Sequence, residues 1–404
     1  MPPEPFMSYT SCWTLHFALS FLALSGVSFA FGANAREAVP VDGDPFHAQF
    51  AGAETQWQLT FLSGGQKRAV PAADLICWGV CPEVPRRPLL VLADGGLLAA
   101  EVRRLGKESL AAESELFGSL AVPLELVAGV VFQAPADRRR RELLVDRIAT
   151  ASGDADRLIL ANDDELAGTL EGIENQIVNL QTSLGAVPVE TRLARALILN
   201  PSLVHREKPG ALRALAGLQD GSRLQALHLT TEGQALKIGL AGGLVWGTAR
   251  DQLVWLHTLG GRVAYLSDLQ PQSHRHVPFL DLAWPYRLDR SVTGSWLRCA
   301  ERLYPKGLGV HSRSRLTYVL DQPYRRFEAD LGIDDETAGR GSVRFRVLVD
   351  GSLKYESPTI RGSMNPVPVS LDISGAKQLD LEVDYADRAD EMDRADWLGA
   401  RLVR

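Results

Sequence analysis

The segment from Asp384 to Asp396 holds six carboxylates, in the run DYADRADEMDRAD. Oxygen ligands in a loop are the ligands that calcium prefers in proteins. The spacing differs from that of an EF-hand loop, and two arginines are interleaved among the acids. Two interpretations therefore stay open. One is a solvated acidic loop, and the other is a structural calcium site with Asp384, Asp387, Asp390 and Asp393 as candidate ligands.

Other residues that could bind a metal or do redox chemistry are sparse. His274 and His276 are two residues apart and would share one face of a strand, but no third ligand is evident. Cys77 and Cys81 have three residues between them, whereas a redox pair has two. They are either a small local disulfide in an oxidising compartment or two thiols. Apart from the calcium alternative, we expect no cofactor.

Short catalytic motifs are absent. The sequence contains no Gly-x-Ser-x-Gly elbow, no phosphate loop and no dinucleotide fingerprint. A glycosidase needs two carboxylates facing one another across a cleft, and nothing in the spacing pairs any two of the many carboxylates. Glycosidase carboxylates leave no short signature, so a glycoside hydrolase with its active site within residues 36–262 remains an alternative.

Length and charge narrow the class of protein. A chain of 404 residues is too long for one compact core, which predicts two or three domains. Charged residues make up 23% and hydrophobic residues 46%, as in ordinary soluble proteins. The net charge of -6 does not favour a nucleic-acid partner, since general nucleic-acid binders are usually basic.

The N-terminus has the pattern of an export signal. Residues 12–30 carry no charge, and Ala33-Asn34-Ala35 fits the small-x-small cleavage site of a signal peptidase. No basic residue precedes the apolar run, and an uncleaved anchor is the alternative. We predict a signal peptide over residues 1–35, no membrane span after its cleavage, and a periplasmic, cell-surface or secreted protein.

Three segments in the first two thirds of the chain share an opening pattern of an apolar run, an acidic turn and an alternating run. They span residues 89–136, 155–203 and 213–266. Asp94-Gly95 between apolar runs is a strong hairpin signal. Each copy is therefore predicted to be a small antiparallel β unit. Residues 36–88 before them are predicted to be a linker, polar over residues 36–50, and an N-terminal β segment.

Two segments connect these units. Asp137 and the four arginines that follow it could bind a polyanion, but we favour a solvated linker or the start of a helix. Residues 267–290 are rich in proline, aspartate and aromatic residues, and we expect them to be a connecting segment.

Strict alternation of apolar and polar residues marks the last part of the chain, residues 291–404. The runs include Phe327 to Ile333, Val343 to Val349 and Leu379 to Tyr385. Period two over at least six short runs predicts antiparallel strands in two packed sheets. The expected fold class is all-β, with a C-terminal β-sandwich after the repeated units.

Five motifs of this region, in the same order, resemble the NPCBM family of novel putative carbohydrate-binding modules. The resemblance implies a galactose-binding-like jelly roll that binds sugars and is often attached to glycosidases. The motifs are YPKGLGVHSRSRLTY from Tyr304, RF before GIDD at 332–335, GSVRF before Asp350-Gly351, SGA at 374–376, and DRADW at 393–397.

Sugar recognition needs a flat aromatic face and planar polar groups. The candidate residues in this region are Trp397, Tyr304, Tyr355, His311, Arg313, Asp334, Asp335 and Asp396. Each has a structural alternative: Trp397 as a plug of the sandwich, His311 as a core histidine, and Asp334 and Asp335 as caps of a turn.

The favoured hypothesis is an exported, non-catalytic protein that binds a glycan or cell-envelope polysaccharide through its C-terminal sandwich. A module for assembly with envelope protein partners, without sugar binding, is the second hypothesis. The glycoside hydrolase is the third.

Overall fold

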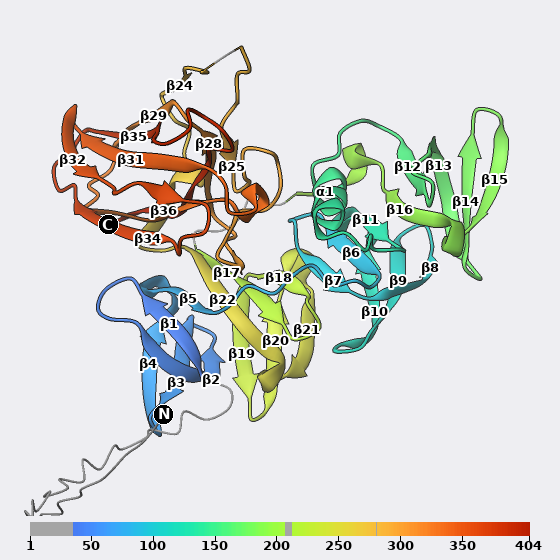
Figure 1. The fold of residues 1–404 in the computed structure, drawn as a ribbon. Coiled ribbons are helices and arrows are strands. Elements are labelled where there is room, and N and C mark those ends of the chain that lie inside the picture. Colours follow the sequence, from blue (N-terminus) through green and yellow to red (C-terminus); the bar gives the residue numbers. More distant parts are fainter. Residues whose placement is uncertain (1–34, 207–211, 280) are drawn as a thin grey trace, which may run out of the picture.

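The computed structural model describes residues 35–206, 212–279 and 281–404, in which β-strands predominate (Figure 1). Four small β units are followed by a C-terminal β-sandwich, which confirms the expected all-β class. Within the described ranges, α1 (Arg138–Ala149) is the only α-helix, and no helix is long and apolar enough to cross a membrane. The expected signal peptide lies outside the described residues except for its last residue.

The four units share one order of strand pairing. In each unit, consecutive strands from the first to the fourth run antiparallel to one another. A 3-10 turn then leads into the last strand, which pairs with the first. The second strand is bent by a bulge in units I and III and broken in two in units II and IV.

The elements of units I and II are β1 (Arg36–Pro40), β2 (Phe46–Glu54), β3 (Gln58–Ser63), β4 (Gln66–Pro71), η1 (Ala72–Asp74) and β5 (Leu75–Gly79), then β6 (Leu89–Leu92), β7 (Leu97–Ala99), β8 (Glu101–Leu105), β9 (Ser109–Ser114), β10 (Gly118–Pro123), η2 (Leu124–Leu126) and β11 (Val127–Val131). The predicted hairpin turn at Asp94-Gly95 joins β6 to β7, with Gly95 at φ +86°.

Units III and IV complete the set. Their elements are β12 (Asp156–Leu160), β13 (Glu165–Glu174), β14 (Ile177–Thr182), β15 (Gly185–Glu190), η3 (Thr191–Leu193) and β16 (Ala194–Ile198), then β17 (Leu212–Leu218), β18 (Arg223–Ala226), β19 (His228–Glu232), β20 (Ala235–Gly239), β21 (Val245–Ala249), η6 (Arg250–Gln252) and β22 (Leu253–Gly260). The short turns η4 (Pro201–Leu203) and η5 (Ala241–Gly243) stand outside this scheme.

Unit I corrects one expectation. The segment 36–50 was expected to be a polar linker, but it contains β1 and the first half of β2. The signal was present, since Asp42-Gly43 stands between two strand-like runs as Asp94-Gly95 does. Pro71 to Leu75 likewise parallels Pro123 to Val127, and both enclose the 3-10 turn.

The units pair in a nested order through their last strands. β5 of unit I pairs with β22 of unit IV, and β11 of unit II pairs with β16 of unit III. A single bridge between β7 and β18 links units II and IV. The first and fourth units are thus neighbours, although units II and III lie between them in the sequence.

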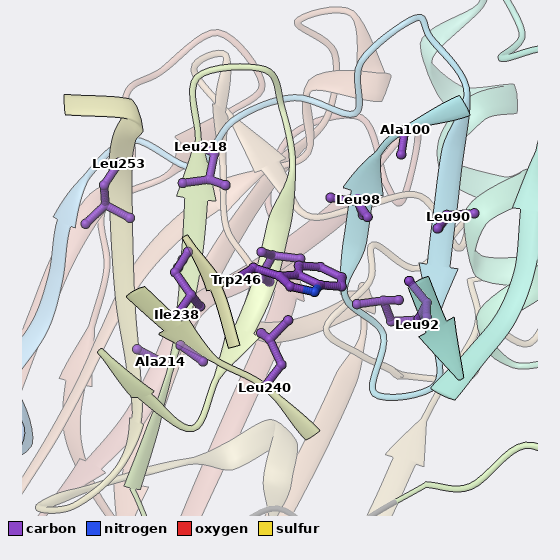
Figure 2. Packing of buried hydrophobic residues seen from close by; sticks show 14 of the residues in the cluster. Leu90, Leu92, Leu98, Ala100, Ala214, Leu218, Ile238, Leu240, Trp246 and Leu253 are labelled. Atoms are coloured by element: carbon purple, nitrogen blue, oxygen red, sulfur yellow. The ribbon is translucent and has the colours of Figure 1, made fainter. Parts of the chain in front are cut away.

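One hydrophobic cluster runs through all four units. Figure 2 shows part of it, with Trp246 between the side chains of unit IV, such as Ile238 and Leu240, and those of unit II, such as Leu92 and Leu98. Trp246 is 5% exposed and packs on Phe117 at 5.5 Å between ring centroids. The units therefore stabilise one another by burial of apolar surface.

The sandwich consists of two antiparallel sheets. The first sheet contains β28 (Gly307–His311), β36 (Arg394–Val403), β30 (Arg326–Ile333) and β34 (Val367–Asp372), with β25 (Arg287–Leu288) and β23 (Val263–Tyr265) at its margins. The second contains β24 (Ser273–His276), β29 (Ser314–Val319), β35 (Gln378–Tyr385), β31 (Ser342–Val349) and β32 (Ser352–Glu356), with β33 (Ile360–Arg361) beside β31. A short hairpin joins β26 (Arg298–Cys299) to β27 (Arg302–Leu303).

The predicted alternation is confirmed. Phe345 and Val347 are 0% exposed and Leu381 is 1% exposed, so these side chains fill the space between the sheets. Their neighbours along the strands, such as Arg346 and Glu382, face solvent. The segment 267–290, expected to be a connection, supplies β24, which pairs with β29.

The arginine run at 138–141 is the first turn of α1, which Asp137 caps by accepting from the Arg140 N–H at 2.8 Å. Arg141 is buried and donates to the carbonyls of Pro135 and Ala136. Arg139 contacts Glu336 of the sandwich at 3.2 Å. The run therefore starts a helix and ties it to its surroundings, which matches the structural alternative.

A buried ion pair joins α1 to the sandwich. The side chains of Arg298 and Glu142 are each 3% exposed and lie 2.8 Å apart, and Arg298 also forms a bidentate pair with Glu83. Trp296 is 6% exposed in the same contact, and the guanidinium of Arg223 lies 3.8 Å from its ring centroid. Burial raises the pKa of Glu142.

Cys77, Cys81 and Cys299 are buried free thiols. Of the two alternatives for Cys77 and Cys81, the structure therefore has the thiols. Burial raises the pKa of both groups, so neither is an activated thiolate.

We expect Arg298→Met to lower the free energy of unfolding by about 3–5 kcal/mol, because it leaves Glu142 buried without a partner. The double variant with Glu142→Gln should recover part of the loss. Urea denaturation measures both. Arg340→Met is the matched control, since Arg340 is exposed and lies 4.0 Å from Glu391. Equal midpoints for Arg298→Met and Arg340→Met would contradict the expectation.

Candidate functional site

A polar hollow of about 210 Å³ lies on the solvent face of the second sheet; we call it the outer hollow. Its walls come from the end of β24, the start of β29, the end of β35 and the middle of β31. Cross-strand register sets Arg275 opposite Arg315, Arg315 opposite Glu382, and Glu382 opposite Arg346. The lining residues are Arg275, Val277, Arg313, Ser314, Arg315, Arg346, Glu382, Val383 and Asp384.

Ion pairs hold the floor of the outer hollow. Arg315 lies 3.1 Å from Glu382 and 2.9 Å from Asp380, and Arg346 lies 3.0 Å from Asp384. Arg315 and Arg346 are thus each held by two different carboxylates. The row presents fixed donors and acceptors side by side, which is the type of surface that can bind the hydroxyls of a sugar.

Two exposed aromatic rings lie at the end of β35 but do not line the hollow. Tyr385 is 39% exposed and meets the ring of Phe279 edge to face at 6.1 Å. Phe279 itself is 53% exposed. Tyr385 stands opposite the core residue Val343, so its side chain leaves β35 on the face opposite to that of Asp384 and Glu382.

Trp284 and two histidines support the same end of the sandwich. Trp284 is half-buried and stacks on His311 with ring centroids 5.1 Å apart and planes 8° apart. The Trp284 N–H donates to His276 Nδ1 at 3.2 Å, and His276 Nε2 donates to the Ser312 carbonyl at 3.1 Å. These bonds fix the position of Trp284 beside Arg313.

Of the predicted candidates, Arg313 and Asp384 line the outer hollow and His311 lies beneath Trp284. His311 is 5% exposed and its Nδ1 donates to the Ser312 carbonyl at 2.9 Å. Burial lowers the pKa of His311. His311 therefore positions a ring rather than facing a ligand, as its structural alternative stated.

The prediction for Trp397 needs correction. Trp397 is 0% exposed and packs edge to face on Phe345, with ring centroids 4.9 Å apart. A ring without an exposed face cannot stack on a sugar, so Trp397 is a core residue.

Asp334, Asp335 and Asp396 do not line the outer hollow. Asp334 and Asp335 line a cleft of about 350 Å³ between α1 and the sandwich. Asp334 caps η8 (Asp335–Thr337), and Asp335 accepts from the N–H groups of Ala300 and Glu301 at 2.9 and 2.8 Å. Both aspartates therefore cap turns, as the structural alternative stated.

Asp396 is fully buried and shares a hydrogen bond with Asp334. Burial raises the pKa of Asp334 to about 6, and burial together with the charge of Asp334 raises the pKa of Asp396 further. Since Asp334 also accepts two backbone N–H bonds, Asp334 is the ionised member and Asp396 carries the proton.

The two tyrosine candidates lie outside the hollow. Tyr304 is half-buried against Leu297 and Leu398, and its hydroxyl bonds to Asp330. Tyr355 lies on β32 opposite Val347 and packs partly on the core.

Three of the four calcium candidates, Asp384, Asp387 and Asp393, have different partners. Asp384 pairs with Arg346, Asp387 lies 2.7 Å from Arg361, and Asp393 accepts from the Ser342 N–H and the Ser312 hydroxyl. Over the described ranges of the chain, no three acidic, histidine or cysteine side chains gather as a metal site would require. The two-histidine group at 274–276 likewise lacks a third ligand there.

Sequence reasoning missed most of the outer hollow. Arg315, Arg346 and Glu382 occupy the polar positions of strands that the alternation predicted, but their proximity depends on register. Phe279 and Trp284 lie in a segment interpreted as a connection. The available signal was a cluster of aromatic residues just before a β-sandwich.

Residues 262–403 match the NPCBM/NEW2 domain family, which confirms the resemblance in the C-terminal region and supports carbohydrate binding. Two curated relatives match parts of the chain. One is a putative endo-alpha-N-acetylgalactosaminidase of Renibacterium salmoninarum, with 34% identity over 25% of this chain and 7% of the relative. The other is alpha-1,3-galactosidase B of Akkermansia muciniphila, with 32% identity over 28% of this chain and 14% of the relative. The chain thus matches only a small part of either relative.

Solved structures with similarity include two from Clostridium perfringens. The CBM51 module of GH95 in complex with methyl-galactose has 27% identity and a TM-score of 0.32, covering 35% of this chain and 99% of that chain. The CBM51-2 and INT domains of ZmpB, in complex with GlcNAc, have 26% identity and a TM-score of 0.33, covering 46% and 42%.

The buried pair Asp334 and Asp396 predicts a pH dependence of stability. Both pKa values are above the unfolded value of about 3.9, so the folded state holds the protons of this pair more tightly than the unfolded state does. The resulting stabilisation of the fold is complete below about pH 3.9 and is lost as pH rises through about 6. Asp396→Asn keeps a donor to Asp334 and removes the acid. The variant should therefore lose less free energy of unfolding than the parent between about pH 5 and pH 8, measured by urea denaturation. Parallel losses in the two proteins would refute this assignment.

Proposed function

We propose that the C-terminal sandwich binds a glycan at the outer hollow, with the row of arginines and carboxylates binding the hydroxyls of one sugar and with Tyr385 and Phe279 contacting a further sugar ring beyond the hollow. The observation that carries the proposal is the row of fixed arginines and carboxylates across neighbouring strands, in a domain that matches the NPCBM/NEW2 family. A rigid sheet that presents few, fixed groups gives shallow and weak binding.

The proposed ligand contains galactose or N-acetylgalactosamine. The names of both curated relatives describe enzymes that act on galactose or N-acetylgalactosamine linkages. The proposed role is non-catalytic, because Glu382 and Asp384 are each held by an arginine. A carboxylate in an ion pair stays ionised and is a poor general acid, which a glycosidase needs.

The four β units are proposed to hold the sandwich in place and to act as spacer or assembly modules. A larger hollow, of about 890 Å³, lies between units II and III, outside the residues that match the NPCBM/NEW2 family. It therefore lies outside the domain on which the glycan proposal rests. The apolar, uncharged run at residues 12–30 supports a location outside the cytoplasm.

Tyr385→Ala should weaken glycan binding about fivefold or more, because ring contacts of this kind contribute roughly 1 kcal/mol. Isothermal titration of the full chain with galactose-containing oligosaccharides measures the dissociation constant. Leu353→Ala is the matched control, since Leu353 is 52% exposed on the same sheet and outside the hollow. If neither variant loses binding, the glycan site lies elsewhere. If the parent protein retains no oligosaccharide at millimolar concentration, the assembly hypothesis is favoured.

A further inference from the structure

The arginines of the outer hollow are unevenly paired. Its lining contains four arginines and two carboxylates, Glu382 and Asp384. Arg315 and Arg346 take up these two carboxylates, and each has a second acidic partner, Asp380 at 2.9 Å and Glu356 at 3.2 Å. The acidic groups are thus held by two of the arginines, and the remaining two have no carboxylate within hydrogen-bond distance.

Those two arginines are Arg275 and Arg313. In the part of the chain that the structure describes, Arg275 is exposed and has no ion pair within 4.0 Å. The side chain of Arg313 is 59% exposed, and its nearest carboxylate oxygen, on Asp384, is 3.9 Å away, beyond hydrogen-bond distance. Both guanidinium groups keep their donors available.

The backbone holds the two arginines at one rim of the hollow. Arg275 pairs with Arg315 across β24 and β29, and one step further the Val277 N–H donates to the Arg313 carbonyl at 2.9 Å. Arg275 and Arg313 therefore flank Val277 on adjacent strands. Two cations held this close repel one another, and an anion between them removes the repulsion.

We propose that the outer hollow selects an acidic glycan, and that the carboxylate of a sugar acid such as a uronic acid binds between Arg275 and Arg313. This inference rests on the proposed function and specifies its ligand class. The planar guanidinium matches a carboxylate with two parallel hydrogen bonds. A hollow of about 210 Å³ is smaller than a typical drug-sized pocket of about 300 Å³ or more, so it suits one sugar unit of a longer chain.

The test compares two forms of one polymer on the full chain. Polygalacturonate carries a carboxylate on every unit, and its carboxyl-reduced form has the same linkages without the charge. The parent protein should bind the native polymer about tenfold more tightly than the reduced form, measured by affinity electrophoresis. The double variant Arg275→Gln/Arg313→Gln should bind the native and the reduced polymer with about equal affinity. Arg344→Gln is the matched control, because Arg344 lies on the same solvent face and does not line the hollow.

Each other outcome overturns a defined statement. If the parent binds native and reduced polymers equally, the selection of acids is wrong while glycan binding stands. If Arg344→Gln lowers the preference as much as the double variant does, general surface charge is responsible and the assignment to Arg275 and Arg313 is wrong. If neither polymer nor any galactose-containing oligosaccharide is retained, the proposed function itself is wrong.

Discussion

The buried guanidinium group of Arg298 holds the C-terminal sandwich against the rest of the molecule. Arg298 and Glu142 are both buried, and removal of such charges from water costs several kcal/mol per ion unless the partners meet in good geometry. A displacement of the sandwich from α1 would separate them and leave two unpaired charges in a site already closed by Trp296. This contact and the pairing of β23 with both β22 and β36 together set the direction in which the sandwich faces.

Different parts of the sandwich contact α1 and form the outer hollow. Contacts with α1 are made by the β26 region and by the turn that Asp334 caps, whereas the outer hollow is built on β24, β29, β35 and β31. The carboxylates of Asp334, Asp335 and Asp396 stabilise turns and the domain contact. Arginines and aromatic residues of the opposite sheet are left to meet a ligand. A sugar bound there would leave the contact with α1 undisturbed.

The sequence predicts the sandwich well, because one face of most strands is buried and the other is solvated, as Phe345 and Arg346 show. The same rule fails in β36, where Ala395, Asp396, Trp397 and Leu398 are all buried. One face of β36 meets the core, and Leu398 on the other face is covered by Leu297 and Cys299. Alternation cannot reveal a strand covered on both faces, so Trp397 looked available when it was not.

The outer hollow could not be predicted from the sequence, for a different reason. Arg315, Glu382 and Arg346 are neighbours only because three strands pair in one register, and a shift by one residue would turn each side chain to the other face. The sequence predicts each strand but not which positions stand opposite one another. The start of unit I was interpreted as a linker because Pro40 and the polar turn at 42–44 make its first strand short.

The nested pairing of the units has a consequence for synthesis. β5 ends at Gly79, and its partner on β22 includes Trp255, Leu256 and His257. At roughly 5–20 residues per second, translation needs roughly 10 to 35 seconds to reach that partner after β5 is made. For that interval one edge of unit I presents unpaired N–H and C=O groups, which invite association with other chains. Newly made protein should therefore depend on chaperones until the fourth unit emerges from the ribosome.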